Sequence, residues 1–331
     1  MKKHPFVLLA SVLGLFSAAA AESSPFKDVQ YPCCYDNSMQ PALVRFSPSA
    51  NPRPLIVVLH TWSHNYKGAA PYIQEVIQYD FHMIAPDFRG TNKRKDPLSM
   101  GSDAAVSDIV SAVNWMKKQC KVDEKRIYLL GGSGGGHMAL LLAGRHPEIW
   151  AGVSAWCPIS DIKAWCAFHN GKGYGKDIID NIGGDPRTDA KAAEDAAKRS
   201  PLTYLANAKH INIDIATGIH DGHTGSVPIS EAFNAFNKLA DEKDAVPQND
   251  IKLMTEKEQV PTGTPAVNDP GFGSRKVHYR KISNNTRITI FEGGHDILPA
   301  YGYAWLNQQK KGAPANWKTF SASGTAAQLT K

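Results

Sequence analysis

The sequence predicts an α/β protein whose sheet is mostly parallel and doubly wound, with helices on both faces. Continuous runs of Val, Ile and Leu are typical of strands that are buried on both faces, and residues 54–60 form such a run. These runs alternate along the chain with stretches of helical spacing such as residues 103–120. Strands that alternate with helices favour a parallel sheet, because each crossover helix returns the chain to the same sheet edge.

The individual elements follow in order along the chain. Strands are expected at residues 54–60, 82–86, 126–130, 151–156, 211–218 and 287–291, and helices at 103–120, 136–144, 227–245 and 300–309. Residues 159–205 are glycine-rich and then alanine-rich, and we interpret them as an insertion or cap. Residues 246–285 are polar, rich in Pro and Gly, and too long for an ordinary connection, which indicates a substrate-facing loop.

The two ends of the chain are expected to lie outside the folded domain. Lys2 and Lys3 precede an apolar run at 6–16, and three alanines end at residue 21, which predicts a signal peptide over 1–21. The apolar run is too short to span a bilayer, so we expect a secreted or periplasmic protein without stable membrane anchoring. One domain over 22–311 would then precede a flexible tail at 312–331, which is rich in Ala, Ser, Thr and Gly.

The charge and the cysteines exclude some classes of function. The net charge is +6, and the two leader lysines account for two of these charges, so we expect no nucleic-acid partner. An odd number of cysteines leaves at least one unpaired or bonded to another chain. The five are Cys33, Cys34, Cys120, Cys157 and Cys166, and a Cys157–Cys166 disulfide could clip a loop, although the pairing stays open. Their spacing is not that of a zinc or redox site, so no metal and no cofactor is expected.

A glycine-flanked serine lies between the strand at 126–130 and the helix at 136–144. The sequence Gly-Gly-Ser-Gly-Gly at 131–135 contains the G-x-S-x-G pattern of a nucleophile elbow, in which the serine occupies a sharp strand-to-helix turn. The glycines let the strand and the helix pass closely, because neither carries a Cβ atom there. Ser133 is therefore a candidate nucleophile, with the N–H of Gly134 as an oxyanion donor, and the alternative is an ordinary glycine-rich turn.

Two further catalytic residue types follow later strands. In open parallel sheets, chemistry collects at the carboxyl ends of the strands. His295 follows the strand at 287–291 and could accept the proton of Ser133, while Asp221 follows the strand at 211–218 and could orient the imidazole. Asp214 and Asp161 are alternative acids, and His295 could also be an ordinary loop histidine.

The loop after the strand at 54–60 offers substrate contacts. The N–H of Thr61 occupies the place where serine hydrolases of this order put a second oxyanion donor. Four residues near strand ends are candidates for binding the substrate: Trp62, His60, Trp156 and Trp165. For Trp156, packing in the core is an equally good interpretation. His220 and His223 flank Asp221 and could suggest a metal, but two loop histidines without further ligands more often face solvent or substrate.

Motifs in one order extend this pattern along the chain. They are Asp-Phe-Arg-Gly at 87–90, Val-Asp at 122–123, the elbow, Pro147, Pro-Ile-Ser-Asp at 158–161, Ser-Pro-Leu at 200–202, Gly-x-x-Asp at 218–221, Val-Pro at 227–228 and Gly-His at 294–295. From about residue 54 to 306 the chain resembles the catalytic domain of the prolyl oligopeptidase family, within the α/β-hydrolase superfamily. The resemblance implies an α/β-hydrolase fold with Ser133, Asp221 and His295 as the triad.

The chain departs from that family in three ways. Gly134 stands where peptidases of the family often have an aromatic residue, and Asp221 lies six residues before Val227 instead of three. Only about thirty residues separate the leader from the first core strand, too few for one blade of the propeller that restricts those peptidases to short peptides. We therefore expect an open site, and the family resemblance does not by itself fix the substrate.

These observations predict an exported serine hydrolase, most simply a carboxylesterase. The substrate class expected by analogy is an acylated carbohydrate, either a small molecule or a polysaccharide with acetyl or feruloyl esters. The first alternative is a serine peptidase that acts on short peptides, which the family resemblance favours. The second alternative is a non-catalytic binding relative that has kept the scaffold.

Overall fold

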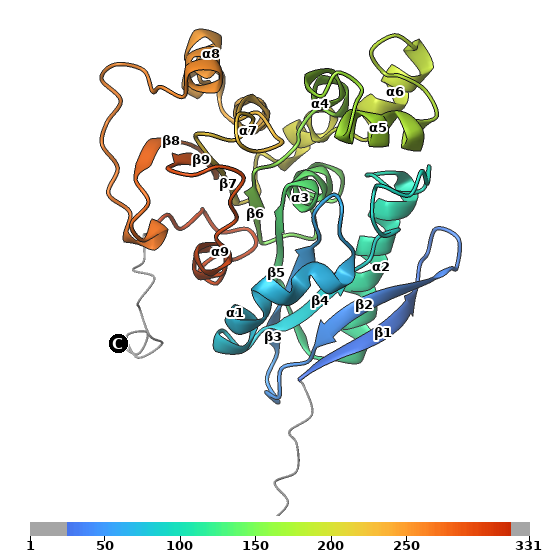
Figure 1. The fold of residues 1–331 in the computed structure, drawn as a ribbon. Coiled ribbons are helices and arrows are strands. Elements are labelled where there is room, and N and C mark those ends of the chain that lie inside the picture. Colours follow the sequence, from blue (N-terminus) through green and yellow to red (C-terminus); the bar gives the residue numbers. More distant parts are fainter. Residues whose placement is uncertain (1–24, 319–331) are drawn as a thin grey trace, which may run out of the picture.

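The computed structural model describes residues 25–318, which form one nine-stranded sheet flanked by helices (Figure 1). The strands are β1 (Phe26–Pro32), β2 (Met39–Arg45), β3 (Arg53–Leu59), β4 (His82–Pro86), β5 (Val122–Gly132), β6 (Gly152–Trp156), β7 (Ile213–Gly218), β8 (Val277–Ser283) and β9 (Thr286–Phe291). Their order in the sheet is β1-β2-β4-β3-β5-β6-β7-β9-β8, and every pairing between β4 and β9 is parallel. The predicted fold class is confirmed.

Helices cover both faces of this sheet (Figure 1). They are α1 (Ile73–Gln78), α2 (Asp103–Gln119), α3 (Gly134–Arg145), α4 (Ile162–Phe168), α5 (Tyr174–Ile182), α6 (Ala190–Lys198), α7 (Ser230–Leu239), α8 (Gln248–Lys257) and α9 (Pro299–Leu306). Side chains of α2, α3 and α7 share one hydrophobic cluster, and side chains of α1 and α9 share another. The two clusters lie on opposite faces, since alternate residues of β3 belong to each: Leu55 and Val57 to the first, Ile56 and Val58 to the second.

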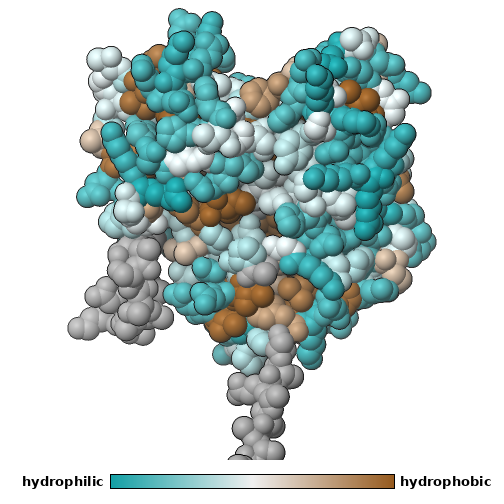
Figure 2. All heavy atoms as spheres, in the orientation of Figure 1, coloured by the Kyte–Doolittle hydropathy of each residue, from teal (hydrophilic) through white to brown (hydrophobic). Residues whose placement is uncertain are grey.

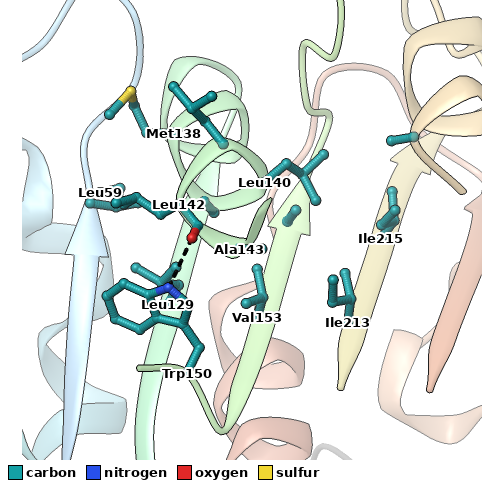
Figure 3. Close-up of a cluster of buried hydrophobic side chains, with 14 of the residues drawn as sticks. Leu59, Leu129, Met138, Leu140, Leu142, Ala143, Trp150, Val153, Ile213 and Ile215 are labelled. Atoms are coloured by element: carbon teal, nitrogen blue, oxygen red, sulfur yellow. Dashed lines mark hydrogen bonds between the residues drawn. The ribbon is translucent and has the colours of Figure 1, made fainter. Parts of the chain in front are cut away.

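The helix α3 is fixed on the centre of the sheet. Figure 3 shows Met138, Leu140 and Leu142 of α3 above the inward side chains of the central strands. The indole of Trp150 closes this cluster and donates a hydrogen bond to the carbonyl oxygen of Leu142 at 3.1 Å. Every residue of α3 from Gly134 to Gly144 is buried, so the helix start that carries the serine is rigidly held.

The structure corrects the prediction for one of the two long insertions. Residues 159–205 hold α4, α5 and α6, which pack around a hydrophobic cluster of their own. Residues 246–285, predicted to be a loop, instead contain α8 and the strand β8, which pairs antiparallel with β9 at the sheet edge. The prediction of a loop was wrong there because an edge strand needs few apolar residues to form its ladder.

The structure describes part of the predicted tail and all five cysteines, but not the predicted leader. The predicted signal peptide at 1–21 lies outside the described residues, as does the tail from 319. At the start of the predicted tail, Trp317 stacks on Trp305 with ring centroids 5.5 Å apart. All five cysteines are free, so the suggested Cys157–Cys166 disulfide is not formed.

The surface of the described residues is mostly hydrophilic. Figure 2 shows hydrophobic side chains in separate small patches on the face in view. The large exposed apolar side chains lie on different elements, and they are Tyr35, Met39, Ile77, Phe168 and Ile282. Between residues 25 and 318, no helix combines the length and the apolar character that crossing a bilayer requires.

A buried ion pair joins β7 to β9. Arg287 donates to both carboxylate oxygens of Asp214 at 2.8 and 2.9 Å, and each side chain is 1 % exposed. We expect Asp214→Ala to lower the free energy of unfolding by about 3–5 kcal/mol, because the guanidinium would remain buried without its counter-charge. Urea unfolding followed by circular dichroism measures this loss.

The control for this prediction is Asp103→Ala. Asp103 pairs with Arg145 at 2.8 Å, but its side chain is 73 % exposed, so the loss should stay below about 1 kcal/mol. Equal losses in the two variants would contradict the role given to the buried pair.

Candidate active site

Ser133 occupies a strained turn between β5 and α3. Its φ of 57° and ψ of −121° place a residue with a side chain in a region that favours glycine. A Cβ atom on Gly131 would lie 2.4 Å from the carbonyl oxygen of Gly135, and one on Gly135 would lie 2.2 Å from that of Leu59. The close approach of strand and helix therefore requires both glycines, and the backbone has the form expected of a nucleophile elbow.

His295 and Asp221 form a hydrogen-bonded pair. The ring Nδ1 of His295 lies 2.7 Å from Oδ2 of Asp221, whose side chain is fully buried. The other carboxylate oxygen accepts the N–H groups of Gly222 at 3.0 Å and Val227 at 3.2 Å. The six-residue spacing to Val227 thus wraps the chain back onto the carboxylate, which fixes Asp221 toward the imidazole.

The two alternative acids are engaged elsewhere. Asp214 binds Arg287 in the middle of the sheet, and Asp161 caps α4 by accepting the N–H of Ala164 at 3.0 Å. Among the three candidate acids, only Asp221 reaches His295.

The loop that carries His295 lies over the elbow. A Cβ atom on Gly132 would be 2.1 Å from Cδ1 of Ile297, two residues after the histidine. Within residues 25–318, however, Ser133 Oγ makes no hydrogen bond, and Ser133 is 7 % exposed. The structure therefore brings the elbow and the acid–base pair together without the serine–imidazole bond, which in hydrolases often tightens only when substrate binds.

The backbone of Trp62 lies against Gly134 at the start of α3. A Cβ atom on Gly134 would lie 2.5 Å from the backbone nitrogen of Trp62, so these two residues are in close contact. In the described part of the chain, the N–H groups of Gly134 and Trp62 donate no hydrogen bond, which leaves both free for a ligand. The sequence predicted Thr61 as the second donor; its N–H also donates no hydrogen bond in the described part of the chain, and the amide of the next residue, Trp62, is the one in contact with Gly134.

His60 and Trp156 do not line a binding pocket, which corrects the prediction. The ring of His60 stacks on Phe88 at 3.9 Å, and its nitrogens lie 2.8 and 2.9 Å from the carbonyl oxygens of Thr61 and Asp87. Burial lowers the pKa of His60, and these two contacts fix its ring against the loop after β3. Trp156 is buried in the core and donates to Ser154 Oγ at 2.9 Å.

Trp62 and Trp165 are buried together beneath the α4–α6 insertion. Their rings meet edge to face with centroids 4.8 Å apart. The indole of Trp62 donates to Asp177 at 3.1 Å, and that of Trp165 donates to the carbonyl oxygen of Ser226 at 2.8 Å. Neither ring is exposed to a substrate in this conformation, so both serve to fix the insertion onto the loop after β3.

Sequence reasoning missed Cys157 at the site. Its thiol, a carboxylate oxygen of Asp221 and a ring nitrogen of His295 all lie within 4.8 Å of one another. Burial, and secondly the charge of Asp221, raises the pKa of Cys157, so the group is a neutral thiol. Its position at the carboxyl end of β6 was the available signal.

The two histidines near Asp221 point to different partners. His220 bonds to Glu258 and Glu292 at 2.8 and 2.9 Å, and His223 lies 2.7 Å from the carbonyl oxygen of Thr255. One ring nitrogen of each histidine therefore bonds to the segment around α8, and the second nitrogen of His220 bonds to Glu292 in the loop after β9.

Comparison with known proteins places this site in a family context. The family profile described as "Prolyl oligopeptidase family" matches residues 71–259, which is more than half of the chain. An acylamino-acid-releasing enzyme of Mus musculus is 24% identical over 179 residues, which cover 49% of this chain and 23% of the mouse protein. A probable acetylxylan esterase A of Neosartorya fischeri is 29% identical over 114 residues, which cover 30% of this chain and 31% of that protein. The chain thus matches about a quarter to a third of the length of these relatives.

Solved structures share the fold. An acetyl xylan esterase from Paenibacillus sp. R4 superposes with a TM-score of 0.56 at 18% identity, over 86% of this chain and 84% of that one. A puromycin-hydrolyzing peptidase from Mycobacterium tuberculosis gives a TM-score of 0.53 at 17% identity, over 66% of this chain and 34% of the peptidase. These similarities support an α/β-hydrolase fold.

Proposed function

Because the chain belongs to the prolyl oligopeptidase family, we propose that it is a serine hydrolase that cleaves carboxylic esters. The observation that carries the proposal is the 2.7 Å contact between His295 and Asp221, held beside the strained elbow of Ser133. A serine hydroxyl is a weak nucleophile and needs such an oriented base.

The mechanism follows from these positions. Ser133 Oγ attacks the ester carbonyl while Nε2 of His295 takes its proton, and Asp221 stabilises the imidazolium through Nδ1–H. The N–H groups of Gly134 and Trp62 bind the oxyanion, a type of contact worth about 3–4 kcal/mol of barrier per donor. His295 then protonates the leaving alcohol, and a water molecule activated by the same base releases the acid from the acyl-enzyme.

The coverage of the two solved structures favours an ester over a peptide. The acetyl xylan esterase structure is matched over nearly the whole of both chains, whereas the peptidase structure is matched over about a third of its length. The proposed substrates are acylated carbohydrates, with acetyl or feruloyl groups on a small molecule or a polysaccharide. The leader predicted at 1–21 is consistent with action outside the cytoplasm, which we include in the proposal. The similarity to acylamino-acid-releasing enzymes favours short peptides as the second candidate.

A comparison of substrates tests this proposal. We expect the purified protein to hydrolyse p-nitrophenyl acetate, acetylated xylan or feruloylated sugars with a higher kcat/KM than alanyl or prolyl p-nitroanilides. The reason is that an ester alcohol is a better leaving group than an amine. Brisk cleavage of the anilides with little turnover of the esters would overturn the ester assignment in favour of a peptidase.

A further inference from the structure

A row of ionisable side chains lies beside the catalytic loops. The ring of His220 bonds to Oε1 of Glu258 at 2.8 Å through Nδ1 and to Oε1 of Glu292 at 2.9 Å through Nε2. The second oxygen of Glu292 bonds to Nε2 of His278 in β8 at 2.7 Å. We call His220, Glu258 and Glu292 the His220 clamp.

The His220 clamp connects three segments that are far apart in sequence. His220 directly precedes Asp221, and Glu292 lies three residues before His295. Glu258 is the residue directly after α8 and therefore lies in the 246–285 insertion. Its backbone is left-handed, with a φ of 54°. The clamp therefore joins the insertion to the two loops that carry the acid and the base.

Neighbouring groups support the same loops. Arg275 donates to the carbonyl oxygen of Glu292 and to Oδ2 of Asp296, each at 3.0 Å. Asp296 also accepts the N–H of Gly294 at 3.0 Å. The clamp thus holds the first residue of the loop from 292 to 296, and Arg275 bonds to both its first and its last residue.

The geometry of the His220 clamp favours the protonated form of His220. Carboxylate oxygens only accept hydrogen bonds, so both ring nitrogens must donate, and only the imidazolium carries two N–H groups. The hydrogen bond to Glu258, followed by that to Glu292, raises the pKa of His220. The bonds from His278 and then His220 lower the pKa of Glu292. Once His220 loses its proton, the ring can donate to only one glutamate.

We propose that His220 is a positioning residue that, as an imidazolium, ties the loop of His295 to the α8 insertion and so holds the base toward Ser133. The inference rests on the proposed function, because it assumes that His295 is the base. Glu258, Glu292 and His278 face the ring or its partners, and Arg275 is the cation at the same loop.

The pH dependence follows from the direction of the shift. The folded-state pKa of His220 lies above its unfolded value, so the clamp is complete below that unfolded value, near 6.5, and is lost as the pH rises through the folded-state pKa. His295 must be neutral to act as a base, whereas His220 must be charged to position it. The clamp therefore adds an alkaline decline to the activity.

The rate at which a fluorophosphonate labels Ser133, measured from about pH 5 to about pH 10, tests the proposal without reference to a substrate. In the unsubstituted protein we expect an alkaline decline of the rate. In His220→Gln the maximal rate should fall about tenfold and the decline should disappear, since a displacement near 1 Å costs up to about a hundredfold. In Glu258→Gln the decline should move to lower pH, because one carboxylate that favours the imidazolium is gone.

The matched control is His146→Gln. His146 pairs with Glu148 at 3.4 Å at the far end of α3, so its replacement should leave the labelling profile unchanged. With p-nitrophenyl acetate, His220→Gln should leave KM unchanged and lower kcat by a factor that changes with pH. A general loss of folded protein would lower kcat by the same factor at every pH.

The outcomes separate the two proposals. If the unsubstituted protein is not labelled, the proposed function fails and the clamp proposal with it. If labelling occurs but His220→Gln and Glu258→Gln keep the original profile, only the clamp is overturned. Should His220→Gln fail to fold by circular dichroism, the shift in Glu258→Gln, which keeps the histidine, decides the question.

Discussion

Ser133→Ala is expected to lower kcat for p-nitrophenyl acetate about 10⁶-fold and to abolish fluorophosphonate labelling. Alanine removes the only atom that can form the acyl-enzyme, while the strained turn and the packing of α3 remain. Initial rates at saturating substrate and mass spectrometry of the labelled protein measure the two effects.

The control for this prediction is Ser63→Ala. Ser63 lies in the loop after β3, next to Trp62, so it is a nearby serine outside the elbow. Its variant should keep both the rate and the label. Labelling that persists in Ser133→Ala would refute the nucleophile, and labelling lost in both variants would point to a disturbed loop.

Asp221→Asn is expected to lower kcat about 10⁴-fold with little change in stability. The N–H groups of Gly222 and Val227, which donate to Oδ1 of Asp221, would donate to the amide oxygen of asparagine and hold it in the same place. The amide nitrogen then faces Nδ1 of His295, where the carboxylate oxygen now lies at 2.7 Å. Because the amide donates there, the ring proton must move to Nε2, and the imidazole can no longer accept the proton of Ser133.

Asp161→Asn is the matched control among the acids proposed from the sequence. Asn caps a helix about as well as Asp, so α4 should keep its start and kcat should change less than about threefold. If both variants lose activity to the same extent, the assignment of Asp221 as the orienting acid is wrong. Urea unfolding of each variant shows whether a loss of activity reflects catalysis or folding.

The parallel core and its strand ends could be predicted from the sequence. Strands such as β3 are buried on both faces, so their sequences are continuous apolar runs. The order of Ser133, Asp221 and His295 after the parallel strands β5, β7 and β9 was informative, since parallel strands end at one edge of the sheet. The structure adds what order cannot give, namely the 2.7 Å contact that selects Asp221 over Asp214.

The edge strands and the roles of the aromatic residues could not be predicted. The strand β8 is half polar because one side of it meets solvent, so its residues resemble a loop. A tryptophan after a strand end can face a pocket or the core, and the sequence does not specify which side the loop turns. Trp156 and Trp62 both turn inward. The partners of His220 lie 38 and 72 residues away, beyond any local pattern.

Trp62 belongs to two parts of the molecule with different roles. Its indole belongs to the hydrophobic cluster of the α4–α6 insertion, while its amide lies beside Gly134 at the start of α3. Under the proposed mechanism the amide of Trp62 binds the oxyanion and has to keep its place beside Gly134, whatever insertion covers this end of the sheet. We therefore expect that replacing the α4–α6 insertion with one from another protein would keep activity only if the new insertion packs around the indole ring of Trp62.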